Sequence, residues 1–184
     1  RAWMEANLER RTSGSGHARP ETVEALVEQR ALQRQLFDGG FAGISYPAEY
    51  GGRGLSVRHE RAFNEEARRF VVPDLGVAGH VTMGPIGRSI VAHGSPEMKA
   101  RHIPRILSGD ELWCQFYSEP EAGSAVTDLK TSATPDGDGY RINGSKVFTT
   151  HSAYAEVILT YVRFGPGVGG IGSVLIPTSA PGVR

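Results

Sequence analysis

The sequence predicts an α+β fold in which an N-terminal all-helical domain, residues 1–110, precedes an antiparallel β-barrel domain, residues 111–184. Two observations lead to this prediction. Apolar residues recur at helical spacing before Asp110 and at the two-residue spacing of strands after it. Clusters of glycine, proline and aspartate separate the candidate strands, as in antiparallel hairpins. Helices followed by strands favour α+β over an alternating α/β fold.

Glycine and proline divide the helical half into segments. Residues 1–11 form a short candidate helix, and a longer one begins at Pro20 and ends at Gly39-Gly40, where a left-handed cap is expected. Its expected apolar face consists of Val23, Leu26, Val27, Ala31, Leu32 and Leu36. Residues 41–54 are predicted to form a loop. Further helices are expected over 56–70, 75–94 and 95–108, the last of them with Ser95 as its N-cap.

The second half carries five candidate strands. They cover residues 112–117, 129–134, 140–148, 156–164 and 172–176. Residues 135–139 (PDGDG) predict a tight hairpin, because glycine and aspartate supply the positive φ that such turns need. Residues 165–170 predict a second hairpin loop. The sequence stops at Arg184 without a closing strand, so we expect the barrel to be incomplete and the chain to be truncated.

Charge and cysteine content exclude several classes of protein. Twenty basic and twenty acidic residues cancel, which gives no electrostatic case for nucleic acid or a membrane as the main partner. The single cysteine, Cys114, excludes an intrachain disulfide and fits a reducing cytosol, so a cytoplasmic location is expected. The six histidines show no pair at metal-ligand spacing, so no metal site is expected.

One short segment, WCQFYSEPEAGSAVTDLKT at 113–131, combines a strand of large apolar residues with two carboxylates, a proline and a run of small residues. One interpretation is a capping box, with Ser118 as a helix cap and Glu121 three residues later. The other is a site for a planar ring such as an isoalloxazine. A strand end offers backbone groups and a hydroxyl, and small residues let a flat ligand approach the main chain.

A second segment favours the ligand interpretation, because KVFTTHS at 146–152 places an aromatic residue and hydroxyls at another strand end. Together, SEPEAGSAVTDLKTSA and INGSKVFTT resemble the acyl-CoA dehydrogenase family. YPAEYGGRGLS and HGSPEMKARHIPRILSGDELWCQFYSEP match the same family, in the expected order. The resemblance extends from about Leu36 to Val183.

The resemblance implies a flavoprotein with N-terminal helices, a middle β domain and a C-terminal helical bundle, which is absent from this sequence. It implies FAD contacts at Gln115, Phe116, Tyr117, Ser118, Phe148, Thr149 and Thr150. It also implies that Ser124 lies beside the substrate and that Thr150 offers its hydroxyl to the flavin. Ala125 replaces a common aspartate of the motif, and Phe148 replaces the usual tryptophan.

The chemistry implied by the resemblance is α,β-dehydrogenation of an acyl-CoA thioester. A carboxylate removes the α-proton while the β-hydrogen leaves as hydride to FAD. Family members carry this base on the C-terminal bundle, so it is expected beyond Arg184, and no catalytic residue is expected in this segment. An electron-transfer flavoprotein is the expected electron acceptor, and a homo- or hetero-tetramer is expected. An acyl-CoA oxidase and a non-catalytic partner subunit remain alternatives.

Overall fold

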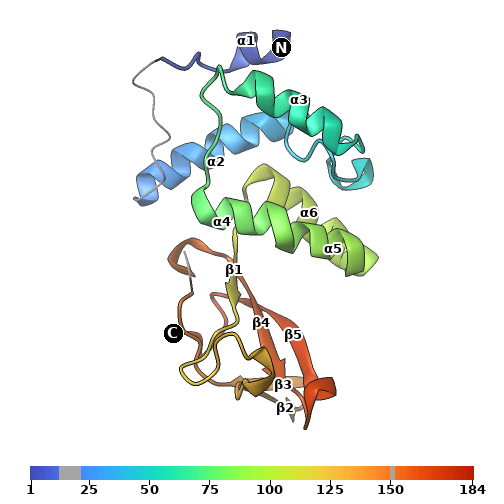
Figure 1. Cartoon of the computed structure of the whole chain (residues 1–184), viewed down its shortest axis with the longest axis vertical. Coiled ribbons are helices and arrows are strands. Elements are labelled where there is room, and N and C mark those ends of the chain that lie inside the picture. The colour runs from blue at the N-terminus through green and yellow to red at the C-terminus, as the bar shows by residue number, and fades with distance from the viewer. Residues whose placement is uncertain (13–21, 150–151) are drawn as a thin grey trace. The chain divides into compact units, whose positions relative to one another are not determined.

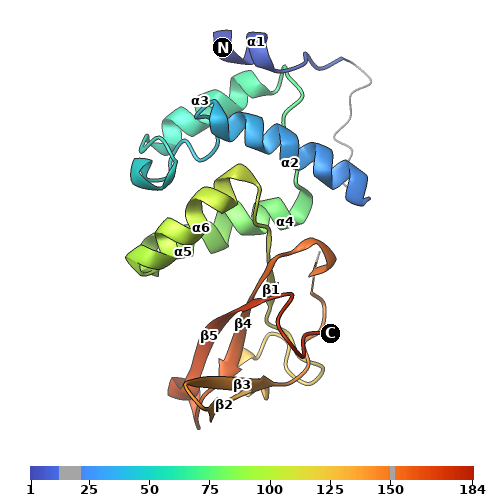
Figure 2. The same ribbon diagram turned by 180° about the vertical axis from the view of Figure 1, so that it is seen from behind.

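The computed structural model describes residues 1–12, 22–149 and 152–184. Its contacts divide the chain into two compact units, Arg1–Leu112 and Trp113–Arg184. Figures 1 and 2 show helices throughout the first unit and strands throughout the second. The predicted change from helical to strand structure is therefore confirmed, and each unit is described by itself below.

Six α-helices lie in the described part of the first unit. Their bounds are α1 Ala2–Asn7, α2 Val23–Asp38, α3 Val57–Ala67, α4 Gly76–Val81, α5 Gly87–His93 and α6 Pro96–Ser108. A π-helical turn, Thr82–Ile86, joins α4 to α5 and contains Pro85. Proline has no N–H and obstructs the normal helical ladder, so the wider turn lets the two helices run on without a long loop. In the part of the chain that the structure describes, no helix is long and apolar enough to cross a membrane.

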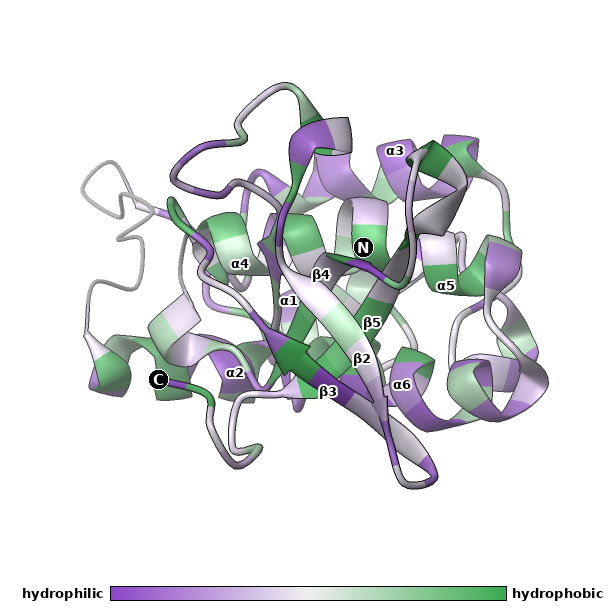
Figure 3. Cartoon of the chain, turned by 90° about the horizontal axis from the view of Figure 1, so that it is seen from below, coloured by the Kyte–Doolittle hydropathy of each residue, from purple (hydrophilic) through white to green (hydrophobic). Residues whose placement is uncertain are grey.

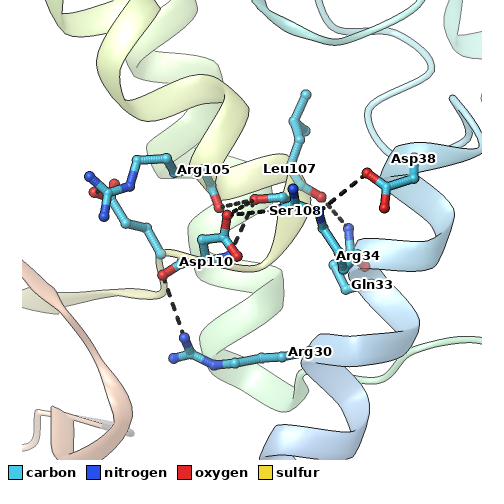
Figure 4. A network of polar contacts seen from close by, with 9 residues as sticks. Arg30, Gln33, Arg34, Asp38, Arg105, Leu107, Ser108 and Asp110 are labelled. Atoms are coloured by element: carbon cyan, nitrogen blue, oxygen red, sulfur yellow. Dashed lines mark hydrogen bonds and ion pairs between the residues drawn. The ribbon is translucent and has the colours of Figure 1, made fainter.

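Helices α2 and α6 are joined by buried and surface polar contacts (Figure 4). Gln33 of α2 is buried and donates to the carbonyl of Leu107 over 2.7 Å. Arg34 pairs with Asp110 at 2.9 Å, just beyond the end of α6. In Figure 3, α6 shows hydrophilic and hydrophobic segments in alternation, as expected for a helix with one buried face.

The expected apolar face of α2 is only partly correct. Leu26 and Leu36 are buried, but Val23 and Val27 are 60% and 61% exposed. The buried positions include Gln33, seven residues after Leu26, so the helix turns its 26/33/36 face inward. The apolar spacing is compatible with more than one buried face of the helix. The face that packs contains the polar Gln33, so the sequence pattern did not identify it.

The first turn of α6 gives a stability prediction. Ser95 caps this helix, because its Oγ accepts a hydrogen bond from the N–H of Met98 at 3.2 Å. Ser95→Ala is expected to lower the free energy of unfolding by about 1 kcal/mol, because that N–H loses its partner. Urea unfolding followed by circular dichroism measures the change. Ser56→Ala is the matched control, since Ser56 precedes α3 without a side-chain cap bond. An equal loss in both variants would contradict the assigned cap.

The second unit contains a five-stranded sheet. Its strands are β1 Trp113–Phe116, β2 Ser132–Asp136, β3 Gly139–Asn143, β4 Val157–Arg163 and β5 Ile171–Pro177. The central strand β4 pairs with β5 along its length, with β1 over its first half and with β2 at Arg163. Both predicted hairpins, β2–β3 and β4–β5, are antiparallel, and Gly137 has the positive φ (60°) that the first one needs. Trp113 and Val162 are fully buried in this unit.

The predicted antiparallel barrel is wrong in two respects. The sheet is mixed, because β4 runs parallel to β1 and to β2, and it is not closed. Parallel neighbours need a long crossover connection, which residues 117–156 supply between β1 and β4. Turn signals fix the pairing of strands on either side of a short loop, but they carry no information about strands this far apart.

Candidate functional site

The predicted site residues at the end of strand β1 lie on two different faces of the sheet. Neighbouring side chains of a strand point to opposite faces. Gln115 lies opposite Leu159 of β4 and Phe116 lies opposite Thr160, so these two pairs lie on different faces. Phe116 is partly buried and packs on a buried cluster that includes Cys114 and Ile158.

Tyr117 follows β1 and stacks obliquely on Tyr161, with ring centroids 4.6 Å apart. Burial, reinforced by Tyr161, raises the pKa of Tyr117 to about 12. The phenol is therefore protonated at neutral pH and keeps a hydrogen-bond donor on this face. Tyr117 continues the face that Gln115 begins, because the two residues are two positions apart.

The acidic motif forms a tight turn. The N–H of Glu119 donates to the carbonyl of Ala122 at 2.8 Å, and the N–H of Ala122 donates back to the carbonyl of Glu119 at 3.2 Å. No helix starts at Ser118 in the described chain, so the capping-box interpretation is wrong. The turn leaves Ser124 exposed just after it.

Glu119 is buried and fully engaged. Its carboxylate accepts hydrogen bonds from the N–H of Lys130 at 2.6 Å and the N–H of Thr131 at 3.0 Å. It also pairs with Lys146 at 2.7 Å, and both side chains are only 5% exposed. Burial alone would raise the pKa of Glu119, but the Lys146 ammonium and the backbone N–H groups outweigh burial and lower it from 4.5 to about 2.

Lys146 lies in the second predicted stretch, residues 146–152, and its contacts join this stretch to the first one, residues 113–131. Lys146 Nζ also donates to the carbonyl of Tyr117 at 3.3 Å. The next residue, Val147, donates its N–H to the carbonyl of Ser118 at 2.9 Å. The end of β1 and the start of the second stretch therefore lie side by side, although Lys146 and Glu119 are 27 positions apart in sequence.

The second stretch presents an unusual aromatic residue. Phe148 is 91% exposed and has φ of 58°, a left-handed conformation that non-glycine residues seldom adopt. Such strained backbone is typical of functional sites. Thr149 Oγ1 donates to Ser152 Oγ at 3.2 Å. Thr150 lies outside the described residues.

Ser124 does not take part in the contacts that join the two stretches. The loop that follows it is held by Arg163 at the end of β4, which donates to the carbonyls of Thr127 at 2.6 Å and Leu129 at 3.1 Å. The structure thus brings Tyr117 and Ser118 to the stretch that carries Phe148 and leaves Ser124 on an exposed loop nearby in sequence.

Two further features of the second unit bear on ligands. A cavity of about 970 Å³ lies on the Phe116 face of the sheet, where Ile158 and Thr160 also line it. Within residues 1–12, 22–149 and 152–184, no group of three or more His, Cys, Asp and Glu residues is placed to hold a metal ion.

Sequence reasoning missed the role of Lys146. The residue stood inside a predicted stretch, but its partner is 27 positions away. A single sequence shows neither which acid a lysine meets nor that both are buried. Tyr161 was likewise not predicted to contact Tyr117, because its place depends on the parallel pairing of β1 with β4.

Comparison with known proteins gives the class of this chain. Residues 15–110 match the acyl-CoA dehydrogenase N-terminal domain, and residues 114–184 match the acyl-CoA dehydrogenase middle domain. Acyl-CoA dehydrogenase IpdE1 of Mycobacterium tuberculosis (strain ATCC 25618 / H37Rv) is 38% identical over 164 residues, which cover 88% of this chain and 42% of the relative. The chain belongs to the acyl-CoA dehydrogenase family, whose members are flavoproteins.

Solved structures give the same class. The Tcur3481–Tcur3483 steroid ACAD is similar with a TM-score of 0.70 and 34% identity, over 84% of this chain and 40% of the other. The ChsE4–ChsE5 complex from Mycobacterium tuberculosis is similar with a TM-score of 0.67 and 30% identity, over 94% of this chain and 50% of the other. The chain thus spans at most about half the length of each relative named here.

Proposed function

We propose that the full-length protein carrying this chain is an FAD-dependent acyl-CoA dehydrogenase that converts an acyl-CoA thioester to its enoyl-CoA. One observation carries the proposal. The two stretches that resemble the family's flavin-contacting motifs meet in space, through Lys146 on the carbonyl of Tyr117 and through Val147 on the carbonyl of Ser118. Two separate motifs joined in this way supply one continuous wall for a ligand.

The residues of this wall fit a flavin. Phe148 offers an exposed aromatic face, and a planar ring system stacks favourably on such a face. Tyr117 is half-buried and offers a protonated phenol. An ideal Cβ at Gly123 would meet nothing within 4 Å, so the turn leaves open space beside the motif. We propose contacts to FAD from Gln115, Tyr117, Ser118, Phe148, Thr149 and Thr150.

Phe116 takes a different part in this proposal. Its ring packs on the interior cluster, and its carbonyl accepts a hydrogen bond from Thr160 at 2.7 Å. We therefore propose that Phe116 supports the flavin wall from behind, while Gln115 and Tyr117 present their side chains to the cofactor. Ser124 is the proposed contact to the thioester end of the substrate.

Bound FAD would supply the hydride acceptor of the dehydrogenation. Residues of this chain would hold the flavin in place and exclude water from one side of it. The α-proton needs a carboxylate base. Glu119 is a poor candidate, because its oxygens already accept three hydrogen bonds and a carboxylate with a pKa near 2 is a weak base. We propose that the base lies outside residues 1–184.

The proposed partners follow from the family. An acyl-CoA is the substrate, and an electron-transfer flavoprotein is the proposed electron acceptor. Similarity to the ChsE4–ChsE5 complex supports assembly with a second chain. We propose a homo- or hetero-tetramer, and a non-catalytic partner subunit is the second candidate function. Similarity to a steroid ACAD supports testing CoA thioesters with ring-bearing acyl groups beside straight chains.

The experiment uses the full-length protein. The purified protein should be yellow, release FAD on denaturation, and lose its absorbance near the flavin maximum when an acyl-CoA is added without oxygen. A dehydrogenase stays reduced after air is admitted, whereas an oxidase recovers its colour. A colourless protein that gains FAD only with a partner chain would be a non-catalytic subunit. A protein that binds no flavin under either condition would overturn the proposal.

Ser124→Ala in the full-length protein tests the substrate side of the site. We expect weaker acyl-CoA binding or slower turnover with an unchanged melting temperature, because an exposed loop hydroxyl contributes little to stability. Steady-state kinetics and thermal melting give the two values. Unchanged kinetics with a lower melting temperature would make Ser124 a structural residue. Thr127→Ala, on the same exposed loop, is the matched control.

A further inference from the structure

The buried pair of Glu119 and Lys146 is not explained by stability alone. Each side chain is 5% exposed, so both charges have lost most of their water. Desolvating two charges costs as much as their attraction returns unless the geometry is excellent, and apolar pairs of similar size are often as stable. We therefore asked which groups the hydrogen bonds of this pair hold in place.

The directions are specific here. The Glu119 carboxylate is fixed from one side by the backbone N–H groups of Lys130 and Thr131. Its remaining bond holds the ammonium of Lys146, at 2.7 Å. That ammonium also donates to the carbonyl of Tyr117 at 3.3 Å. Three separate segments of backbone thus converge on one carboxylate–ammonium pair.

The lysine also stands two residues before the strained part of the second stretch. Phe148 has φ of 58° and is 91% exposed, so few contacts of its own side chain hold this conformation. Strained conformations persist only where their surroundings hold them. The contacts just before it, from Lys146 to Tyr117 and from Val147 to Ser118, hold the chain on its N-terminal side, and Thr149 bonds to Ser152 after it.

We propose that Lys146 is a positioning residue of the flavin site, which fixes the main chain of residues 147–149 against the end of β1 through Glu119 and the Tyr117 carbonyl. This inference rests on the proposed function. It assigns Lys146 no contact with FAD. The residue acts by setting the place of the Phe148 ring and of the Thr149 backbone that follows it.

The test measures FAD binding rather than turnover. In the full-length protein, Lys146→Met is compared with Lys146→Arg, with the double variant Lys146→Met, Glu119→Gln, and with Lys130→Met. Lys130 is the matched control, because its side chain is 71% exposed and pairs with Glu121 on the surface. The double variant leaves no unpaired buried charge, so it tests the same contact if Lys146→Met alone does not fold.

Each variant is titrated with FAD, and the dissociation constant is read from flavin fluorescence. The visible circular dichroism of bound flavin reports the asymmetry of its surroundings. We expect at least a tenfold weaker affinity and an altered spectrum in Lys146→Met and in the double variant, partial recovery in Lys146→Arg, and no change in Lys130→Met.

The outcomes separate this inference from the proposed function. A lower melting temperature with unchanged FAD affinity and spectrum in both methionine variants would make the pair merely structural and overturn the positioning role, while the proposed function would stand. A wild-type protein that binds no FAD would overturn both. Equal losses in Lys146→Met and Lys130→Met would also overturn the positioning role, since any lost surface charge would then do the same.

Discussion

Residues 1–184 expressed alone are expected not to reduce FAD with any acyl-CoA. Glu119 and Glu121 are the carboxylates of the acidic motif, and neither is placed as a catalytic base would be. Glu119 is buried, accepts bonds from three N–H donors and has a pKa near 2. Glu121 forms an ion pair with Lys130. A placed base typically contributes 10²–10⁴-fold to such a proton transfer, so without one the reduction is expected to be slower by about that factor.

The measurement is the anaerobic flavin absorbance of the isolated chain with FAD and a panel of acyl-CoAs. The full-length protein under the same conditions is the positive control. Bleaching by the isolated chain would show that a base within residues 1–184 suffices. Loss of that bleaching in Glu121→Gln, but not in Glu119→Gln, would then identify the base as Glu121.

Acid is expected to destabilise the second unit through Glu119. Its folded pKa, about 2, lies below its ordinary value of 4.5. A lowered carboxyl pKa contributes stability that is present above the unfolded pKa and is lost as pH falls through the folded one. The contribution is thus complete at neutral pH and disappears between about pH 4.5 and pH 2. The gap corresponds to about 3 kcal/mol at neutral pH.

Glu119→Gln removes this pH-dependent contribution. The free energy of urea unfolding, followed by Trp113 fluorescence in a Trp3→Phe background, should fall by about 3 kcal/mol at pH 7 and differ little from wild type near pH 2. Glu121→Gln is the control, because the Glu121 side chain is 67% exposed and should change stability little. Parallel pH profiles for wild type and Glu119→Gln would contradict the assigned ion pair.

Local features of the fold followed from the sequence. The hairpin at Gly137 was predictable because a two-residue turn needs residues that tolerate positive φ. The start of α6 was predictable because Ser95 and Pro96 form a cap and a first-turn pair. In both cases the determining residues lie within a few positions of one another.

Features of the fold that join distant parts of the chain could not be predicted from the sequence. The parallel pairing of β1 with β4 joins Trp113 to Val157 across a long crossover, which no turn signal records. The inward face of α2 was misassigned because a buried Gln33 looks polar in sequence, although it hydrogen-bonds the carbonyl of Leu107. A buried polar residue with a satisfied partner is not distinguishable from a surface one by pattern alone.

The candidate site could be predicted only in part, because the residues that join its two stretches are far apart in the sequence. Its two stretches stood out because each was predicted to place hydroxyls and an aromatic residue at a strand end. This is correct for the first stretch, but β3 ends at Asn143, before the second one, so the predicted strand over 140–148 is too long. Their meeting depends on Lys146, Glu119 and the main chain of Ser118, which only the folded chain brings together. The capping-box interpretation of Ser118 failed because Glu119 turns back on Ala122, and no helix of the described chain begins at Ser118.

The two stretches are proposed to form one flavin-facing wall. Hydrogen–deuterium exchange of the full-length protein, with and without FAD, tests this proposal, because backbone amides close to a bound ligand exchange more slowly. We expect slower exchange on FAD binding in peptides that cover 115–119 and 147–149, and unchanged exchange in the β4–β5 loop at 165–170. Slower exchange in only one of the two stretches, or in neither, would contradict it.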